Sequence, residues 1–584
     1  MYCKKCGTSI AEGTDVCPAC GYAKEEAAEE INANVQAEES ATTENAFEEP
    51  SFEPEQKPSK GKKKIIIAAI ACVAALAIVL TTILNFDTLK GFAIKKFGSD
   101  ADYYGYVEKA AWDGVREDIV SAYGDFKDNI GTQSVSSTIG FDVGDGINNL
   151  LSLGINDELV DLVDNASIKF DMAQNNALSQ LKLALSVSEN PILNLDVITD
   201  LLNGNGYIGL PNIVKDYLAA KIDVATDKLI IYDEAFWDAM PDADQLDKLL
   251  DKYFDLVIDS ITQVEKTEDE LKVGDVTQKC TVIKFELSPE LVLNTAEKVL
   301  TTLKADKDVE KIVKDVNTYL AGKDLVDSTD AYNELVKFIE KSVEAIKKEK
   351  DALAGEKAIT VLTFIDGDHN IIGREVIDAE QTMMSVKKAR NKDNFAVEIL
   401  LADQFEVTGK GTEKGGVVNG EYSFEIDGSD MFVVTLKDFK ADGITDGVAS
   451  GSIKVSGTDE LWGEMDLDVT VRTLLKLYDP AIELVVDNTK NASNVTINLI
   501  GQDKVLFGIS FNSQKSKLPQ ITIPGATVDS ANQDELQNWL ESFDLDGLKD
   551  TFEEAGLPEG IVDSLFEMIE SSVSGQASDA ELEY

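Results

Sequence analysis

The chain has 584 residues, of which 43% are hydrophobic, so it can form several domains and bury a sizeable core. It carries 54 Lys and Arg against 107 Asp and Glu, a formal net charge of -53. This charge excludes nucleic acid as a partner, because binding there depends on neutralising phosphates with basic groups. His369 is the single histidine, so sites that need two histidines are excluded. Cys280 is the single cysteine after Cys72, so the long C-terminal part of the chain cannot be held together by internal disulfides.

Four cysteines lie close to the N-terminus as two C-x2-C pairs, Cys3 with Cys6 and Cys17 with Cys20. Four thiolates at this spacing suit one tetrahedral Zn²⁺ ion, and so short a segment needs the metal to supply its folding energy. A thioredoxin-type redox motif also uses C-x2-C, but it requires a βαβ setting that this segment does not offer. Residues 1–22 resemble the zinc ribbon at the N-terminus of single-pass membrane proteins of Gram-positive bacteria. The resemblance implies one closed, structural zinc site with these four cysteines as ligands.

Residues 23–64 are predicted to form a disordered linker, acidic at first and ending in a cluster of lysines. Residues 65–84 contain twenty consecutive positions without a charge, and a helix of that length spans about 30 Å, the thickness of a bilayer's hydrocarbon core. The run begins too far along the chain, and is too long, for a cleaved signal peptide. It is therefore predicted to be an uncleaved transmembrane helix. The lysines before it place the N-terminus in the cytoplasm and residues 85–584 outside the cell membrane.

The exterior part is predicted to be α+β, with large antiparallel β-sheet lobes covered by helices. Residues 85–130 are expected to form a helical stalk, amphipathic over 100–127, although this helix could instead pack on the domain. A first sheet-plus-helix lobe is expected at 131–355 and a second, β-rich lobe with C-terminal helices at 356–584. Alternating apolar residues predict a strand meander in the second lobe, including a strand at 463–471.

No catalytic constellation is apparent in the sequence, so the protein is predicted not to be an enzyme. Asp366, Asp368 and Asn370 imitate the start of a calcium loop, but isoleucine stands where that loop needs glycine and glutamate, so a hairpin turn is expected. His369 on this turn is expected to be exposed. Cys280 is expected to be an inert structural thiol on the more polar side of its strand.

The leading functional hypothesis is a single-pass envelope protein whose exterior domain binds or scaffolds without catalysis. Its expected partners are the lipid bilayer, a cytosolic protein at the zinc ribbon, and an apolar ligand or cell-wall component outside. The lobes weakly resemble the curved-sheet lipoprotein carriers of bacterial envelopes, which implies an apolar groove, although the same side chains could simply fill a core. Two alternatives are a transmembrane sensor that signals through the ribbon and a cell-wall enzyme that uses acidic residues.

Overall fold

The computed structural model describes residues 95–573, with gaps at 97, 130–131, 145–156, 223–233, 324, 327–329, 354, 403, 443–447 and 466–467. These residues belong to the larger of the two units into which the chain divides, Ile70–Tyr584. The predicted zinc ribbon (1–22), linker (23–64) and transmembrane helix (65–84) lie outside the described residues. Within the described part, none of the helices combines the length and the apolar character needed to cross a membrane.

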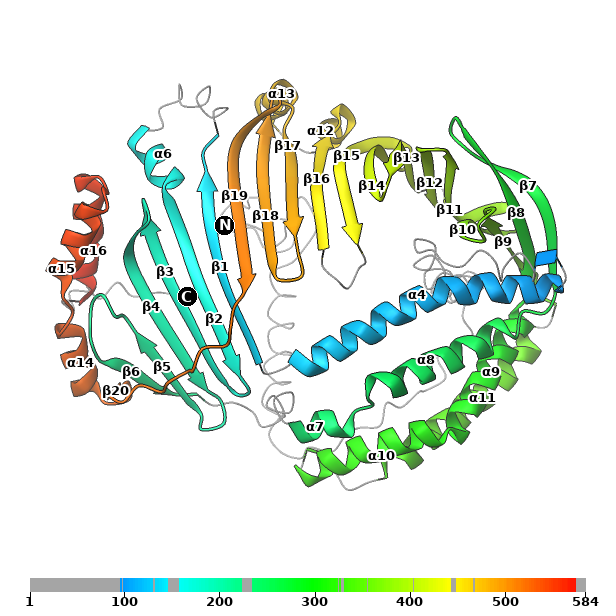
Figure 1. Ribbon diagram of the computed structural model, residues 1–584, viewed down its shortest axis with the longest axis horizontal. Coiled ribbons are helices and arrows are strands. Elements are labelled where there is room, and N and C mark those ends of the chain that lie inside the picture. Colours follow the sequence, from blue (N-terminus) through cyan, green and yellow to red (C-terminus); the bar gives the residue numbers. More distant parts are fainter. Residues whose placement is uncertain are drawn as a thin grey trace, which may run out of the picture. The chain divides into compact units, whose positions relative to one another are not determined.

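The fold is α+β, as expected, and is built on one large sheet (Figure 1). The strands up to the middle of the chain are β1 (Thr132–Asp142), β2 (Ala166–Asn175), β3 (Leu178–Val187), β4 (Asn190–Asp200), β5 (Asn205–Gly209), β6 (Tyr217–Lys221), β7 (Val264–Val273) and β8 (Val276–Leu287). The later strands are β9 (Ile359–Ile365), β10 (Ile371–Asp378), β11 (Gln381–Asn391), β12 (Asn394–Leu401), β13 (Phe405–Lys414), β14 (Val417–Ile426), β15 (Ser429–Asp442), β16 (Val448–Gly457), β17 (Ala481–Asn488), β18 (Ala492–Gly501), β19 (Lys504–Lys515) and β20 (Thr527–Asp529). Strands β6 and β20 add to the predicted set, and at 5 and 3 residues they are too short to show alternation.

The helices follow the same order along the chain. They are α4 (Asp100–Asn129), α6 (Asp157–Asp164), α7 (Glu234–Ala239), α8 (Ala243–Ile258), α9 (Pro289–Ala305), α10 (Lys307–Gly322), α11 (Ala331–Ala352), α12 (Asp459–Glu464), α13 (Val469–Tyr478), α14 (Gln533–Glu541), α15 (Leu545–Glu554) and α16 (Glu559–Val573). The predicted strand at 463–471 is wrong, because α12 and α13 occupy this region. The alternating apolar positions there suggest a strand, but the carboxylate of Asp468 accepts a hydrogen bond from the Thr470 N–H at 2.8 Å and begins α13 instead.

The strands form one row, from β7 and β8 through β9 to β19 in chain order, then β1 to β6, and finally β20. Neighbours are antiparallel except β6 and β20, which are parallel. The predicted division into lobes at 131–355 and 356–584 is therefore corrected. Strand β8 of the first pairs with β9 of the second, and β1 pairs with β19, so one sheet joins both. The alternation of apolar and polar residues identifies the strands, but it does not specify which strands far apart in the sequence pair with each other.

Tight hairpins explain why consecutive strands pair along the meander. At several of these turns two successive residues have positive φ, as type I′ turns require, for example Gln502 (52°) with Asp503 (59°) and Gly415 (60°) with Gly416 (78°). Such turns match the right-handed twist of the strands that they join. The sheet is consequently a regular ladder in which the side chains of opposed residues share a face.

Helix α4 packs on the sheet and on α8, so the predicted stalk at 85–130 is corrected. Tyr103, Tyr104, Val107 and Ala111 of α4 are buried against Ile283 and Phe285 of β8, Val361 and Ile365 of β9, and Ile371 of β10. At the other end of the row, α15 and α16 cover part of β3 and β4. Helices α7 to α11 contact one another and join α4 through α8.

Candidate functional site: an uncovered apolar sheet face

The register of the central strands aligns apolar side chains in rows that cross the sheet. We call these rows the apolar face. The first row is Val434, Val455, Ile482, Leu499 and Phe507, on β15 to β19. The second is Leu436, Ile453, Leu484, Ile497, Ile509 and Phe141, on β15 to β19 and β1. The third is Val486, Val495, Phe511, Ile139, Ile168 and Leu185, on β17 to β19 and β1 to β3.

The apolar face continues the face on which α4 lies at the other end of the sheet. Paired positions lead from Ile283 of β8 through Thr363, Arg374, Val386, Ile399, Val407 and Phe424 to Phe432 of β15 without changing sides. Under α4 the members of this face are buried: Ile283, Val361 and Ile365 are at most 6% exposed. The same side of the sheet is therefore covered by α4 near β8 and carries the apolar rows on β15 to β19 and β1 to β3.

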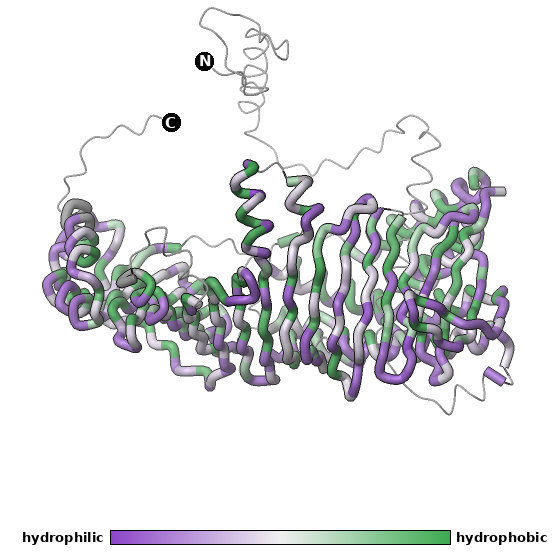
Figure 2. The backbone as a smooth tube through the Cα atoms, turned by 90° about the horizontal axis from the view of Figure 1, so that it is seen from above, coloured by the Kyte–Doolittle hydropathy of each residue, from purple (hydrophilic) through white to green (hydrophobic). Residues whose placement is uncertain are grey.

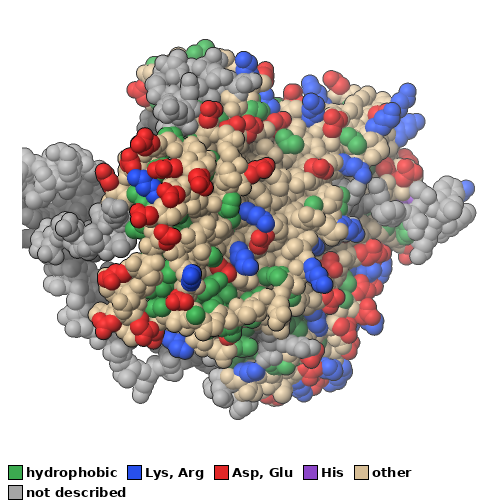
Figure 3. All heavy atoms as spheres, turned by 60° about the vertical axis from the view of Figure 1, so that its left-hand side comes forward, with side chains coloured by type: hydrophobic (Ala, Val, Ile, Leu, Met, Phe, Trp, Pro, Cys, Tyr) green, Lys and Arg blue, Asp and Glu red, His purple; other side chains and the backbone are tan. Residues whose placement is uncertain are grey.

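The described residues cover only part of the apolar face: Leu185, at the end of the third row, packs under α15 and α16, and Val486 is buried, but other members of the rows are exposed. Ile482 is 55% exposed, Leu499 43%, Ile497 39% and Val455 38%, values that a packed core would not leave. The buried hydrophobic clusters in the described part take no member from β13 to β19. Figure 3 shows one side of the molecule, on which hydrophobic side chains reach the surface in a group among charged ones.

The two faces of these strands differ in charge, although one row of the opposite face, with Val433, Ala481 and Ile500, is also largely apolar. The three apolar rows contain no ionisable side chain, although 28% of all residues are charged. A row on the opposite face reads Lys454, Glu483, Asn498, Gly508 and Asp142. The colours along the strands in Figure 2 alternate accordingly. The segregation follows from the period of two in the sequence and gives this region an electrically neutral surface.

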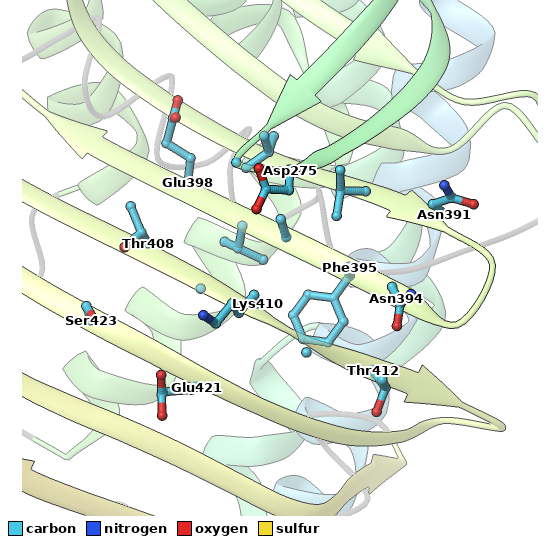
Figure 4. A pocket seen from close by; sticks show the side chains of 17 residues that line it. Asp275, Asn391, Asn394, Phe395, Glu398, Thr408, Lys410, Thr412, Glu421 and Ser423 are labelled. Carbon is cyan, nitrogen blue, oxygen red and sulfur yellow. The ribbon is translucent and has the colours of Figure 1, made fainter.

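A hollow of about 710 Å³ lies on the polar face, between the tip of the β7–β8 hairpin and strands β12 to β14 (Figure 4). Asp275, Glu398, Lys410 and Glu421 line it, and Lys410 is directly opposite Glu421 in the ladder. Among the described residues, no group of three or more His, Cys, Asp or Glu side chains could hold a metal ion. The hollow is open, its lining mixes apolar with charged side chains, and it offers no feature that selects one ligand.

The residues singled out from the sequence lie apart from the apolar face. Cys3, Cys6, Cys17 and Cys20 fall outside the described residues, so zinc binding stays a prediction. Cys280 is only 4% exposed, because the β7–β8 hairpin to which it belongs packs against Ala389 and Ala396, and the expected polar surroundings are wrong. Burial raises the pKa of the Cys280 thiol, which keeps it protonated and fits a structural role.

The Asp366–Asn370 segment is a hairpin turn, as predicted. The Asp366 carboxylate accepts hydrogen bonds from the N–H groups of Asp368 (2.9 Å) and Asn370 (2.8 Å), so its oxygens hold the turn together. His369, however, is 6% exposed, and its predicted exposure is wrong. Its Nδ1 lies 3.0 Å from the hydroxyl of Tyr103, because α4 packs over the turn.

The sequence analysis expected an apolar groove and an apolar ligand, but it did not identify which residues form the apolar face. Alternation identifies the strands, but it cannot distinguish a row that a helix covers from a row that stays open. Comparison of the chain with protein-family models, with curated proteins and with solved structures found no match.

Proposed function

We propose that this protein is a membrane-anchored envelope protein that binds the acyl chains of lipids, without catalysis, on its apolar face. The observation that carries the proposal is the set of uncharged rows across β15 to β19 and β1, with Ile482 and Leu499 about half exposed. Large uncovered apolar patches mark binding surfaces or membrane contacts.

The chemistry of the face favours hydrocarbon over other ligands. A bound sugar or peptide would need hydrogen-bond partners, and the three rows offer none in their side chains. A hydrocarbon chain needs none and gains about 0.8 kcal/mol for each methylene that leaves water. Strands lie about 4.8 Å apart, so the second row, over six strands, is about 24 Å long. A lipid chain fills about half of a 30 Å hydrocarbon core, so one row accommodates a whole chain.

The rest of the chain supplies the setting of this proposal. Residues 65–84 are the anchor, the lysines at 57–64 keep the N-terminus in the cytoplasm, and Cys3, Cys6, Cys17 and Cys20 hold a structural zinc ion. The ribbon resemblance supports the same arrangement. A lipid-binding domain outside the membrane would then remain beside the source of its ligand.

Photo-crosslinking tests the proposal with the full chain. The protein is reconstituted in liposomes whose phospholipid carries a diazirine in one acyl chain, irradiated, and digested for mass spectrometry. We expect cross-links on β16 to β19 in addition to those on residues 65–84, which serve as the internal reference. The variant Ile482→Asp/Leu499→Asp should lose most of the strand cross-links, because it places two charges in the first row.

Val485→Asp is the matched control. Val485 is 37% exposed and lies on β17 as Ile482 does, but it points to the opposite face, so the strand cross-links should persist. Cross-links confined to residues 65–84 in the unchanged chain would contradict lipid binding. Loss of self-association in the double variant, measured by sedimentation, would instead assign the face to a second copy of the chain.

A further inference from the structure

The helices α12 and α13 form an insertion between β16 and β17 that exposes apolar side chains. Met465 is 42% exposed, Val469 75%, Val471 44%, Leu474 48% and Leu477 60%. Val471, Leu474 and Leu477 are spaced by three residues and therefore lie on one side of α13. In Figure 2 two helices at the positions of α12 and α13 rise away from the row of strands.

This insertion is continuous with the apolar face. The ring of Trp462 on α12 lies against Gly457 of β16, where an added Cβ would come within 2.2 Å of it. Gly457 continues the side of the sheet that carries Val455. Strand β17 starts shortly after α13, and its second residue, Ile482, is the most exposed member of the first row. Exposed apolar surface thus runs from α13 onto the rows.

The charge of α13 differs from that of the chain around it. Its sequence, VTVRTLLKLY, contains Arg472 and Lys476 and no acidic residue, in a chain with a net charge of -53. Lys476 forms an ion pair with Asp459 of α12 at 3.1 Å, and Arg472 donates to the Met465 carbonyl at 3.1 Å. Leucine and valine on one side with basic residues beside them is the composition of a helix that lies in a membrane interface.

We infer that α12 and α13 are a membrane-contacting tip, which inserts its apolar side chains among lipid acyl chains and passes lipid to the apolar face. A second copy of the chain fits the tip less well, because four exposed apolar side chains on α13 and Met465 beside α12 by themselves offer far less than the roughly 800 Å² per partner of a stable interface. A bilayer needs no such area, because its acyl chains accept the apolar side chains of α13 without a matched surface. The inference rests on the proposed function and names the place where lipid arrives.

Quenching by brominated lipid tests this tip in the full chain. Leu474→Trp adds one indole at the tip, and Phe338→Trp adds one on α11, where Phe338 is 65% exposed. Each variant is reconstituted with ordinary or acyl-brominated phosphatidylcholine, and the emission of the unchanged chain is subtracted. We expect brominated lipid to remove most of the added emission of L474W and little of that of F338W. Both substitutions lie on exposed helix surfaces, and far-UV circular dichroism checks that each variant is folded.

Two further variants separate the tip from the binding face. The tip variant V471D/L474D/L477D should slow lipid cross-linking of β16 to β19. The binding-face variant I482D/L499D, made in the chain that also carries L474W, should abolish this cross-linking. The indole at position 474 should still be quenched by brominated lipid in that variant. Equal quenching of L474W and F338W overturns the tip and leaves the apolar face standing. Quenching of L474W together with no strand cross-links in the unchanged chain keeps the membrane contact of the tip, but it overturns both lipid binding on the apolar face and its delivery by the tip.

Discussion

His369, the single histidine, shows how a tertiary contact changes the character of one side chain. It has a φ of 69° on the β9–β10 turn, and its ring makes edge-to-face contacts with Tyr103 and Tyr106 of α4. Burial, and then the charge of Lys95, lower the pKa of His369, while Asp366 and Asp368 act in the opposite direction. The folded protein therefore holds the imidazole neutral at pH values where the unfolded chain protonates it.

This shift predicts that acid weakens the fold through His369. The unfolded histidine titrates near pH 6.5, so stability is complete above that value and falls as the pH drops toward the lower folded pKa. One proton contributes at most about 1.4 kcal/mol per pH unit. We expect His369→Asn, which tolerates the positive φ, to lose less stability than the unchanged chain between pH 7.5 and 5.5 in guanidinium unfolding. Equal losses in the two chains would show that His369 does not titrate between the two states.

Helix α4 is held on the sheet by a buried ion pair as well as by apolar contacts. Arg374 of β10 donates to both carboxylate oxygens of Glu108, at 2.7 and 2.5 Å, and to the Thr363 hydroxyl at 3.1 Å. Both charged side chains are at most 2% exposed. The helix begins at a reciprocal cap, in which Ser99 N–H donates to the Asp102 carboxylate and Asp102 N–H donates to the Ser99 hydroxyl. The ion pair then fixes which side of α4 meets the sheet.

Removing one partner of this pair should loosen α4. We expect Arg374→Met to destabilise the protein by about 3–5 kcal/mol, because it leaves the Glu108 carboxylate buried without its partner. The double variant Glu108→Met/Arg374→Met should recover a large part of that loss. Lys109 is the neighbour of Glu108 in the sequence and forms a half-exposed ion pair with Asp255. Lys109→Met should therefore reduce the free energy of unfolding by no more than about 1 kcal/mol. Guanidinium unfolding measures all three, and hydrogen exchange in α4 should rise most in R374M.

At the scale of the whole molecule, one sheet ties distant parts of the chain together. Residues 132–142 pair with residues near 510, so the folded domain cannot be completed until both ends are present. The predicted zinc ribbon is different in kind, because its expected stability comes from the metal and from residues 1–22 alone. The two parts should therefore respond independently to loss of zinc.

This independence can be measured on the full chain. We expect the purified protein to carry one zinc ion, Cys3→Ser and Cys17→Ser to lose it, and Cys280→Ser to keep it, because Cys280 lies in the domain core. All four tryptophans lie between residues 112 and 539, so their fluorescence reports the sheet domain and not the ribbon. Chelation should leave the guanidinium midpoint of that signal unchanged. A lowered midpoint would mean that the metal also supports the sheet.

The sequence alone determined the strands of the meander, most helices and the segregation of apolar and polar side chains, because these follow from local periods of two and 3.6 residues and from turn and capping residues. One example is the hairpin at Asp366–Asn370, and another is the start of α9, where Ser288 precedes Pro289 and its hydroxyl accepts a hydrogen bond from the Leu291 N–H at 3.1 Å. It also carries the predictions of an anchor and a zinc site, which depend on composition and spacing. Local signals failed at α12 and α13, where alternation imitates a strand and Asp468 starts a helix.

Only the tertiary structure decided which surfaces stay open. The pairing of β1 with β19, the packing of α4 on β8 to β10, and the packing of Cys280 against Ala389 and Ala396 are contacts between residues far apart in the chain. No local period encodes them. The same apolar alternation is buried under α4 at Ile283 and exposed at Ile482. The candidate site exists because no helix covers these residues, and which residues a helix covers is decided only when the whole fold is assembled.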